Sequence, residues 1–397
     1  MHDQGRASVP PKGYHRDPPE GVGCLMSEKA VGIGILGFGG FAMFAAQQFA
    51  QVPGVALRCI AGTHREASLA CAARFGLDDV KTAEAMFARP DVDLVYVATP
   101  PFLHHEQARA ALRAGKHVIV EKPLATTVEQ ADELLSIAKQ EGRIVTTNLM
   151  QRYNPLYGRI KALVDSKVLG EPLHGYFENY ACDEGLGPDH WFWDRTKSGG
   201  IFIEHGVHFF DMFEGWLGTG DVESAGRVLR PGSGIEEQVY CAAKYGNVPV
   251  NFYHGFTQAG RMDRQELRIL FERGDVTLDE WIPTRAIVRT ALDESDTKTL
   301  AEIFPGARID VEALYSPTER SLHARHKAYE AYQRITLTSA PSTKMTVYGD
   351  LLRSMLEDQL AFLRNPSHER VITETNGRES LRMSVQASRL ALATESA

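Results

Sequence analysis

The sequence lacks any run rich in lysine and arginine, and its 43 basic residues are outnumbered by 51 acidic ones, for a formal net charge of -8. Electrostatic attraction to phosphates supplies much of the affinity of proteins that bind nucleic acids. We therefore expect no nucleic-acid partner, and an anionic small ligand would need a local positive site.

The chain also lacks a C-x-x-C pair, because its five cysteines are scattered at positions 24, 59, 71, 182 and 241. Disulfide frameworks and structural zinc sites need closely spaced cysteines, whereas free thiols are typical of a reducing compartment. We expect free thiols and a cytoplasmic location.

Charge is missing altogether between Ala30 and Leu57, and residues 31–50 are long enough to span a bilayer. A signal peptide or membrane anchor is the alternative interpretation. Against it, there is no twin-arginine pair and no A-x-A cleavage site, and the stretch contains Gln47, Gln48 and glycines at 32, 34, 37, 39 and 40. We expect no membrane association.

Composition and hydrophobic pattern divide the sequence into segments. Residues 1–29 are rich in proline, glycine and charge and predict a disordered extension. In residues 30–150, short apolar strands alternate with amphipathic helices, which is typical of an α/β fold with a doubly wound parallel sheet. Strands are expected at 31–36, 55–61, 94–98, 117–120 and 144–148, and helices at 41–51, 65–75, 104–114 and 128–141.

Residues 151–397 form the second expected domain, where longer alternating strands and hairpin turns predict a large, mostly antiparallel sheet. Strands are expected at 174–180, 239–245, 250–255 and 266–272, and helices at 348–363 and 378–393. Residues 283–340 give no clear pattern and are expected to be irregular.

A glycine-rich turn follows the first apolar strand and opens a helix. It reads Gly37-Phe38-Gly39-Gly40-Phe41-Ala42, and we expect Gly37, Gly39, Gly40, Phe41 and Ala42 to bind a dinucleotide. The first glycine permits the tight turn, the second lets the backbone approach the pyrophosphate, and the small sixth residue lets helix and strand pack closely. The alternative is a glycine turn in another doubly wound fold.

The end of the second strand lacks the acidic residue that holds the ribose of NAD. Thr63, His64 and Arg65 stand there instead and could bind a 2′-phosphate. We therefore predict NADP as the cofactor, with NAD as the alternative and with Arg65 as a merely solvated residue in that case.

Several further motifs follow in one order. They are Thr99-Pro100-Pro101-x-x-His104, Ala114-Gly115-Lys116-His117-Val118, Glu121-Lys122-Pro123, Arg152-Tyr153-x-Pro155, and Gly199-Gly200-x-x-x-Glu204-x-x-x-His208. In this order they resemble the glucose-fructose oxidoreductase / inositol dehydrogenase (Gfo/Idh/MocA) family. The match is close from residue 31 to 211 and looser beyond. The family usually has aspartate at the position of Glu204 and a third glycine at the position of Ile201.

The resemblance implies a Rossmann domain, a second α/β domain with an open sheet, and an active site between them. It implies an NAD(P)-dependent dehydrogenase or reductase that acts on a secondary alcohol or ketone of a sugar, cyclitol or related polyol. It also implies a homo-oligomer, a dimer or tetramer.

Three residues are the expected catalytic groups. Lys122 follows the strand at 117–120, at the edge of a parallel sheet where ligands bind, and its ammonium can stabilise charge on the reacting oxygen. His208 is the expected general acid/base, since an unperturbed histidine pKa lies near neutral pH. Glu204, four residues earlier, is expected to orient His208 or to pair with Lys122. The resemblance also implies a cis bond before Pro123.

Further residues are expected around the cofactor and the substrate. The nicotinamide ribose side is expected to contact Thr99, Pro100 and His104, with a packing role as the alternative for His104, and Glu121 is a further expected cofactor residue. The expected substrate residues are Arg152, Tyr153, Trp193 and Asp194. Trp191 lies in the same run and could offer a second aromatic face to a sugar ring, and a buried aromatic cluster is the alternative for both tryptophans.

Other functions stay open at this stage. His205 and His208 with Glu204 and Asp211 raise a metal site, but i, i+3 histidine pairs are common by chance and we expect no metal. A reductase of a non-sugar substrate is one alternative function. A non-catalytic NAD(P)-sensing regulator is another, and the catalytic residues argue against it.

Overall fold

The computed structural model describes residues 30–62, 65–183 and 185–393. The predicted disordered extension at 1–29 and the predicted cofactor residues Thr63 and His64 lie outside the described residues, and so does the side chain of Arg65.

The first half of the chain forms a six-stranded parallel sheet in the order β3-β2-β1-β4-β5-β6. The uncharged stretch at 30–57 is the first strand, the glycine turn, a helix and the start of the second strand. The strands are β1 Val31–Leu36, β2 Val55–Ala61, β3 Asp78–Asp79, β4 Leu94–Val97, β5 His117–Val120 and β6 Val145–Thr147.

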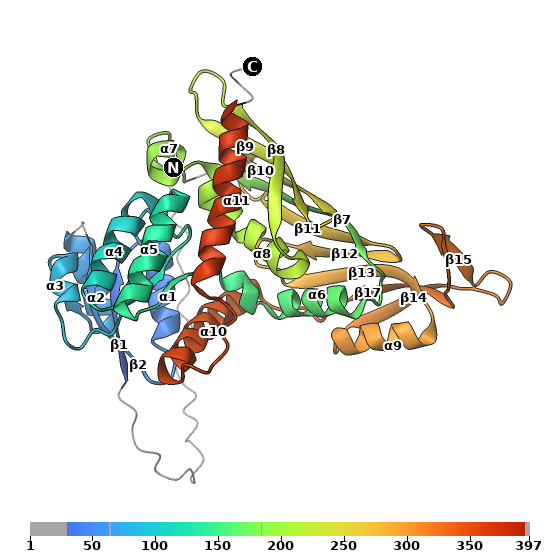
Figure 1. Cartoon of the computed structure of the whole chain (residues 1–397), viewed down its shortest axis with the longest axis horizontal. Helices are drawn as coiled ribbons and strands as arrows, with labels where there is room; N and C mark the ends of the chain where they lie inside the picture. The colour runs from blue at the N-terminus through green and yellow to red at the C-terminus, as the bar shows by residue number, and fades with distance from the viewer. Residues whose placement is uncertain (1–29, 63–64, 184, 394–397) are drawn as a thin grey trace, which may run out of the picture.

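Helices cover both faces of this sheet, as the continuous apolar strands predict (Figure 1). One face packs on α1 Gly40–Phe49, α2 Arg65–Phe75 and the C-terminal α10 Lys344–Arg364. The other face packs on α3 Ala83–Phe87, α4 His104–Arg113 and α5 Val128–Glu141. The sequence pattern missed the shortest strand of this half, β3, and its shortest α-helix, α3.

The second half forms a nine-stranded sheet in the order β14-β17-β13-β12-β11-β7-β10-β9-β8, in which only β7 and β10 run parallel. The predicted mostly antiparallel sheet is confirmed. Its strands are β7 Pro172–Cys182, β8 Gly220–Leu229, β9 Glu236–Tyr245, β10 Val248–Gln258, β11 Arg264–Phe271, β12 Gly274–Asp279, β13 Arg285–Leu292, β14 Arg308–Leu314 and β17 Gln333–Thr338.

The prediction of an irregular segment at 283–340 is wrong. This segment contains β13, β14 and β17, the helix α9 Glu294–Ile303, and a small hairpin of β15 Ser321–Ala324 and β16 Lys327–Glu330. The edge strand β14 and the hairpin bury few side chains, so they carry little of the alternation that marks a strand.

The apolar cluster on one face of the large sheet includes residues of the helices α6 Pro155–Ser166, α8 Val207–Leu217, α9 and α11 Glu374–Ala393. The short elements of this half are α7 Arg195–Ser198, the turns η2 Met150–Tyr153 and η3 Trp191–Trp193, and the π-helical turn η4 Phe202–Gly206. The turn η1 Pro101–Leu103 follows β4 in the first half. Helix α11 contacts β8 and α8 on one side and α5 and β6 on the other, so it joins the two sheets (Figure 1). No helix in the described part of the chain is long and apolar enough to cross a membrane.

Candidate active site

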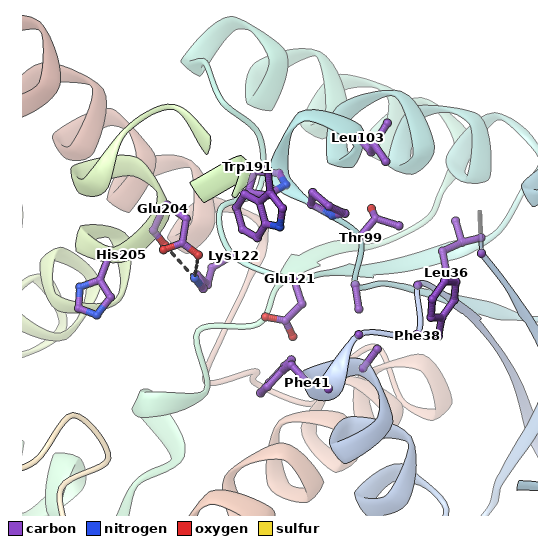
Figure 2. Close-up of a pocket in the computed structure, with 18 of the residues that line it drawn as sticks. Leu36, Phe38, Phe41, Thr99, Leu103, Glu121, Lys122, Trp191, Glu204 and His205 are labelled. Atoms are coloured by element: carbon purple, nitrogen blue, oxygen red, sulfur yellow. Dashed lines mark hydrogen bonds and ion pairs between the residues drawn. The ribbon is translucent and has the colours of Figure 1, made fainter. Parts of the chain in front are cut away.

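A cavity of about 1070 Å³ lies where the carboxyl edge of the parallel sheet faces the second sheet. The turns after β1, β2, β4 and β5 line one end of it, and the segments around η3, η4, β7 and β11 line the other. Ligands of doubly wound sheets bind at this edge, because the loops that follow parallel strands meet there. Figure 2 shows Glu121 and Lys122 between the turn that carries Phe38 and Phe41 and the helix that carries Glu204 and His205.

The glycine turn has the form that a phosphate cradle needs. Gly37 has a φ of 104°, and a Cβ there would lie 2.5 Å from the carbonyl oxygen of Ala98. Gly39 and Gly40 are exposed at the start of α1, where a Cβ would meet nothing within 4 Å. Ala42 is buried against the sheet. The backbone N–H groups at the start of α1 therefore face open space large enough for a pyrophosphate.

The end of β2 carries no carboxylate in its described residues, which end at Gly62. A Cβ at Gly62 would lie 1.9 Å from the ring of Phe38, so the aromatic ring lies directly against this backbone. Lys81 lines the same end of the cavity after β3, the strand next to β2, and its ammonium has no partner among the residues described. Sequence reasoning missed Lys81, because it lies beyond a strand too short to recognise.

The turn after β4 contains two of the predicted cofactor residues, Thr99 and Pro100, and both line the cavity. The Thr99 hydroxyl lies 2.7 Å from Oε1 of Gln107. The predicted cofactor residue His104 is fully buried instead, with Nδ1 2.7 Å from the carbonyl oxygen of Pro123 and Nε2 2.7 Å from that of Thr99. His104 thus ties the turn after β4 to the turn after β5, which is the packing alternative.

Glu121 lines the cavity directly after β5. Its Oε1 accepts hydrogen bonds from the Tyr96 hydroxyl and from Nδ2 of Asn148, the latter at 2.7 Å. Desolvation in this enclosed position raises the pKa of Glu121. The two hydrogen bonds fix the orientation of the carboxyl group.

Lys122 and Glu204 form an ion pair across the cavity, between the turn after β5 and the turn η4. The Lys122 ammonium also donates to the carbonyl oxygen of Glu204 at 2.9 Å. Of the two expectations for Glu204, the pairing with Lys122 is the one that the structure contains. The Lys122–Pro123 peptide bond is cis, as the resemblance implied.

Glu204 lies in a π-helical turn, not in the regular α-helix on which the sequence argument relied. Single π turns are frequent at functional sites. His208 follows in α8 and lines the cavity, and neither of its ring nitrogens bonds a described residue. Desolvation and the nearby Lys122 lower the pKa of His208 to about 3. The expectation of a pKa near neutrality therefore does not hold in this state, and the imidazole is neutral.

His205 lines the cavity beside Glu204 and bonds a second histidine, His254 of β10, with 3.0 Å between their Nδ1 atoms. From the sequence, His205 was expected only as a possible metal ligand, and no motif pointed to His254. The alternation of buried and exposed residues along β10 places His254 on the buried face of that strand, but nothing in the sequence indicates that His254 contacts His205.

The four predicted substrate residues do not line the cavity. Arg152 pairs with the buried Asp211, with Nε 3.0 and 2.9 Å from the two carboxylate oxygens, and Tyr153 donates to Asp358 at 2.6 Å. Trp193 is buried and donates to the carbonyl oxygen of Leu186. Asp194 caps α7 by accepting from the backbone N–H of Thr196 at 3.0 Å. These contacts hold the fold together around the site.

Other side chains take the places at the substrate end. The cavity is lined there by Asn179, His190, Asp263, Gln265 and Trp281, which no sequence motif singled out. Of the two tryptophans considered from the sequence, Trp191 lines the cavity and Trp193 does not. In the parts of the chain that the structure describes, no group of three His, Cys, Asp or Glu side chains could hold a metal ion.

Comparison with protein families decides the classification. Residues 31–149 match the model described as "Oxidoreductase family, NAD-binding Rossmann fold", and residues 157–277 match the "GFO/IDH/MocA C-terminal domain". The chain belongs to the GFO/IDH/MocA oxidoreductase family. The predicted family, the Rossmann domain and the second α/β domain are thereby confirmed.

Curated relatives match over part of their length. The dTDP-3,4-didehydro-2,6-dideoxy-alpha-D-glucose 3-reductase of Actinomadura kijaniata is 34% identical over 157 residues, which is 40% of this chain and 46% of that protein. The scyllo-inositol 2-dehydrogenase (NAD(+)) of Bacillus subtilis is 28% identical over 208 residues, 51% of this chain and 59% of that protein. The chain thus spans about half the length of the curated relatives it matches.

Solved structures share the fold over nearly the whole chain. The WlbA dehydrogenase of Bordetella pertussis, solved with NADH and UDP-GlcNAcA, has a TM-score of 0.74 at 19% identity and covers 93% of this chain and 98% of its own. At this identity the likeness shows the fold alone.

Proposed function

We propose that this member of the family is an NADP-dependent dehydrogenase or reductase that transfers hydride between the nicotinamide and an alcohol or ketone carbon of an uncharged, sugar-like substrate. The observation that carries the proposal is the cavity itself. It joins a phosphate cradle at Gly39 to the Lys122–Glu204 pair and His208, so a cofactor and a reacting carbon fit in one enclosure.

The cofactor end fits a dinucleotide by its own residues. The turn at Gly37–Gly40 offers backbone N–H groups to the pyrophosphate, and Glu121 and the Thr99-Pro100 turn lie on the path to the reacting centre. When bound there, the nicotinamide supplies or accepts the hydride. The protein must then orient the substrate and move one proton.

Lys122 is the group proposed to hold the reacting oxygen. Its ammonium is fixed by two bonds to Glu204 and keeps donor capacity for a third, because an ammonium has three N–H bonds. A preorganised cation at this position stabilises negative charge as it develops on the oxygen. Glu204 acts by fixing the direction of the lysine.

His208 is proposed to take up or return the proton of the hydroxyl group. It lines the cavity, its ring is neutral at neutral pH, and its nitrogens have no partner among the described side chains. A neutral imidazole can accept the hydroxyl proton on its bare ring nitrogen as the C–H bond is oxidised, and can return it in the reverse reaction.

Two features support NADP over NAD. A carboxylate at the end of β2 would repel a 2′-phosphate, and the described residues there carry none. Lys81 offers an unpaired ammonium at the same end of the cavity. The predicted contributions of Thr63, His64 and Arg65 remain part of this proposal.

The charges in the cavity support an uncharged substrate. Its cationic side chains among the described residues are three lysines, of which Lys122 pairs with Glu204 and Lys344 with Glu280, while Lys81 lies at the cofactor end. At the substrate end the carboxylate of Asp263 adds negative charge. A nucleotide diphosphate would find no unpaired cation there, whereas hydroxyl groups would find amide, imidazole and carboxylate partners and two indole faces.

We further propose a cytoplasmic homo-oligomer that associates through the open sheet. The free thiols of Cys59, Cys182 and Cys241 are typical of a reducing compartment. The exposed side of the sheet carries apolar surface, such as the half-exposed side chain of Tyr240 on β9. Light scattering of the purified protein tests the oligomer, and a monomer at micromolar concentration would contradict it.

The function is tested with a panel of neutral sugars, cyclitols and ketoses, each offered with NADP(H) and with NAD(H), while the absorbance of the reduced cofactor is followed. A matched set of nucleotide sugars is the control. We expect turnover of a neutral polyol or ketose with NADP(H). Tight cofactor binding without turnover of any substrate would favour the regulator, and faster turnover of a nucleotide sugar would contradict the uncharged substrate.

A further inference from the structure

The two histidines at the substrate end differ sharply in their surroundings. His205 lies in η4 next to Glu204, is partly exposed and lines the cavity. His254 is fully buried in β10 among the rings of Phe177, Phe202 and Phe209. The contact between them, 3.0 Å from Nδ1 to Nδ1, is the one polar contact that either ring makes with a described residue.

The contact needs one proton between the two Nδ1 atoms. Burial lowers the pKa of His254 to about 3, and burial with the nearby His254, Lys122 and His208 lowers the pKa of His205 well below its usual value. Both rings are therefore neutral at neutral pH. A neutral imidazole has one N–H donor and one bare nitrogen, so one ring donates at Nδ1 and the other accepts.

The buried end of His254 decides which ring donates. Its Nε2 is enclosed and has no partner among the described residues. If His205 donated, His254 would have to carry its proton on this Nε2, and a buried N–H without an acceptor costs about 1–3 kcal/mol. If His254 donates from Nδ1, its Nε2 is a buried acceptor without a donor. For backbone groups in folded proteins, an unpaired buried acceptor is found more often than an unpaired buried N–H, so this arrangement is the less costly one.

We infer that His254 donates to His205 and so locks His205 in the tautomer with its proton on Nε2. His205 then presents a fixed N–H donor to the cavity, beside the Lys122–Glu204 pair. Since this rests on the proposed function, we assign the donor to a substrate oxygen other than the reacting one, which Lys122 holds. His205 is a specificity-determining residue and His254 is its positioning residue.

This arrangement selects a class of substrate. The N–H donor of His205 favours binding of a substrate that has an acceptor, a hydroxyl or ring oxygen, on a carbon near the reacting one. A simple secondary alcohol lacks that oxygen and would leave the N–H of His205 unpaired against the substrate. The inference therefore favours polyols and hydroxyketones over isolated alcohols and ketones.

The first test reads the tautomer without substrate or cofactor. The full-length protein, labelled with ¹⁵N in histidine, gives long-range ¹H–¹⁵N correlations that distinguish the two tautomers, and His205→Gln assigns the signal of His205. We expect the Nε2–H form in the wild type and a mixture of forms in His254→Phe. An Nδ1–H form in the wild type, or an unchanged signal in His254→Phe, would overturn the lock. His254→Leu, which also lacks a donor, replaces the phenylalanine variant if that variant does not fold.

The second test reads the role in recognition. With the best polyol of the panel and its analogue deoxygenated next to the reacting carbon, His205→Leu should raise KM for the polyol about tenfold, the effect of one neutral hydrogen bond, and leave KM for the analogue unchanged. His205→Gln, which keeps a donor near the Nε2 position, should restore most of the preference. Equal losses on both substrates would overturn the recognition role. Absence of turnover in the wild type would refute the proposed function, while the tautomer measurement would still decide the lock.

Discussion

The two ends of the cavity are built in different ways. The cofactor end consists mainly of backbone from one short segment, Gly37–Ala42, with the turns that follow the neighbouring parallel strands. The catalytic and substrate end consists of side chains from segments far apart in the sequence, such as Lys122, Glu204 and Gln265. The first end depends on local conformation, and the second on how the two sheets are joined.

The largest expected effect lies at the second end. Lys122→Met should lower kcat/KM by about 10³-fold, because it removes the cation that stabilises the reacting oxygen, while binding of the reduced cofactor changes little. Stopped-flow or steady-state rates and a fluorescence titration with NADPH measure the two quantities.

Lys116→Met is the matched control for this change. Lys116 precedes the same strand, β5, at its opposite end and bonds the carbonyl oxygens of Arg89 and Val92, each at 2.8 Å, away from the cavity. It should keep the wild-type rate. If both variants lost activity equally, the loss would reflect stability and not the position of the charge.

At the first end, Gly39→Val should weaken cofactor binding about 10- to 100-fold with only the small loss of stability that a less favourable N-cap residue causes. The site has room for a Cβ, but the added side chain fills the space that the pyrophosphate needs and displaces its hydrogen bonds. Gly37→Ala provides the contrast, because φ at Gly37 is 104° and a Cβ would meet the Ala98 carbonyl. It should lower the melting temperature as well. Equal melting temperatures for the two variants would contradict this difference.

The sequence predicted the cofactor end well, because that end depends on local conformation. Turn, strand and helix at 31–49 are set by neighbouring residues, and β1, β2, β5, α2 and α5 have the predicted bounds. At the second end, Lys122, Glu204 and His208 were predicted from the order of the motifs that resemble the family. The contact of His205 with His254 depends on tertiary packing, which the local sequence pattern does not contain. The same holds for which of the two tryptophans, Trp191 and not Trp193, lines the cavity.

Acid should destabilise the second end more than the first. The pKa of His254 is about 3 in the folded protein against about 6.5 unfolded, so its stabilising effect is complete above pH 6.5 and is lost as pH falls toward 3. Between pH 6.5 and 4 this one group removes on the order of 3 kcal/mol from the free energy of unfolding. His254→Phe should make that free energy less dependent on pH, as measured by urea unfolding. An identical pH dependence in both proteins would show that His254 is not buried in its neutral form.

The smallest expected effect concerns the choice of cofactor. Lys81→Ala should reduce the ratio of kcat/KM for NADP to that for NAD about tenfold, since it removes one exposed charge near the 2′-phosphate. Glu84 lines the same end of the cavity and carries the opposite charge, so Glu84→Ala should change the ratio in the opposite direction. A shift in the same direction for both would mean that the phosphate is not bound there.

In the proposed reaction, hydride passes between a carbinol carbon and the nicotinamide in this cavity. Incubation of the protein with NADP and neutral polyols deuterated at carbon, followed by mass spectrometry of the cofactor, tests it most directly. We expect reduced cofactor that has gained one deuterium. Reduced cofactor without deuterium, or no reduction by any polyol, would contradict it.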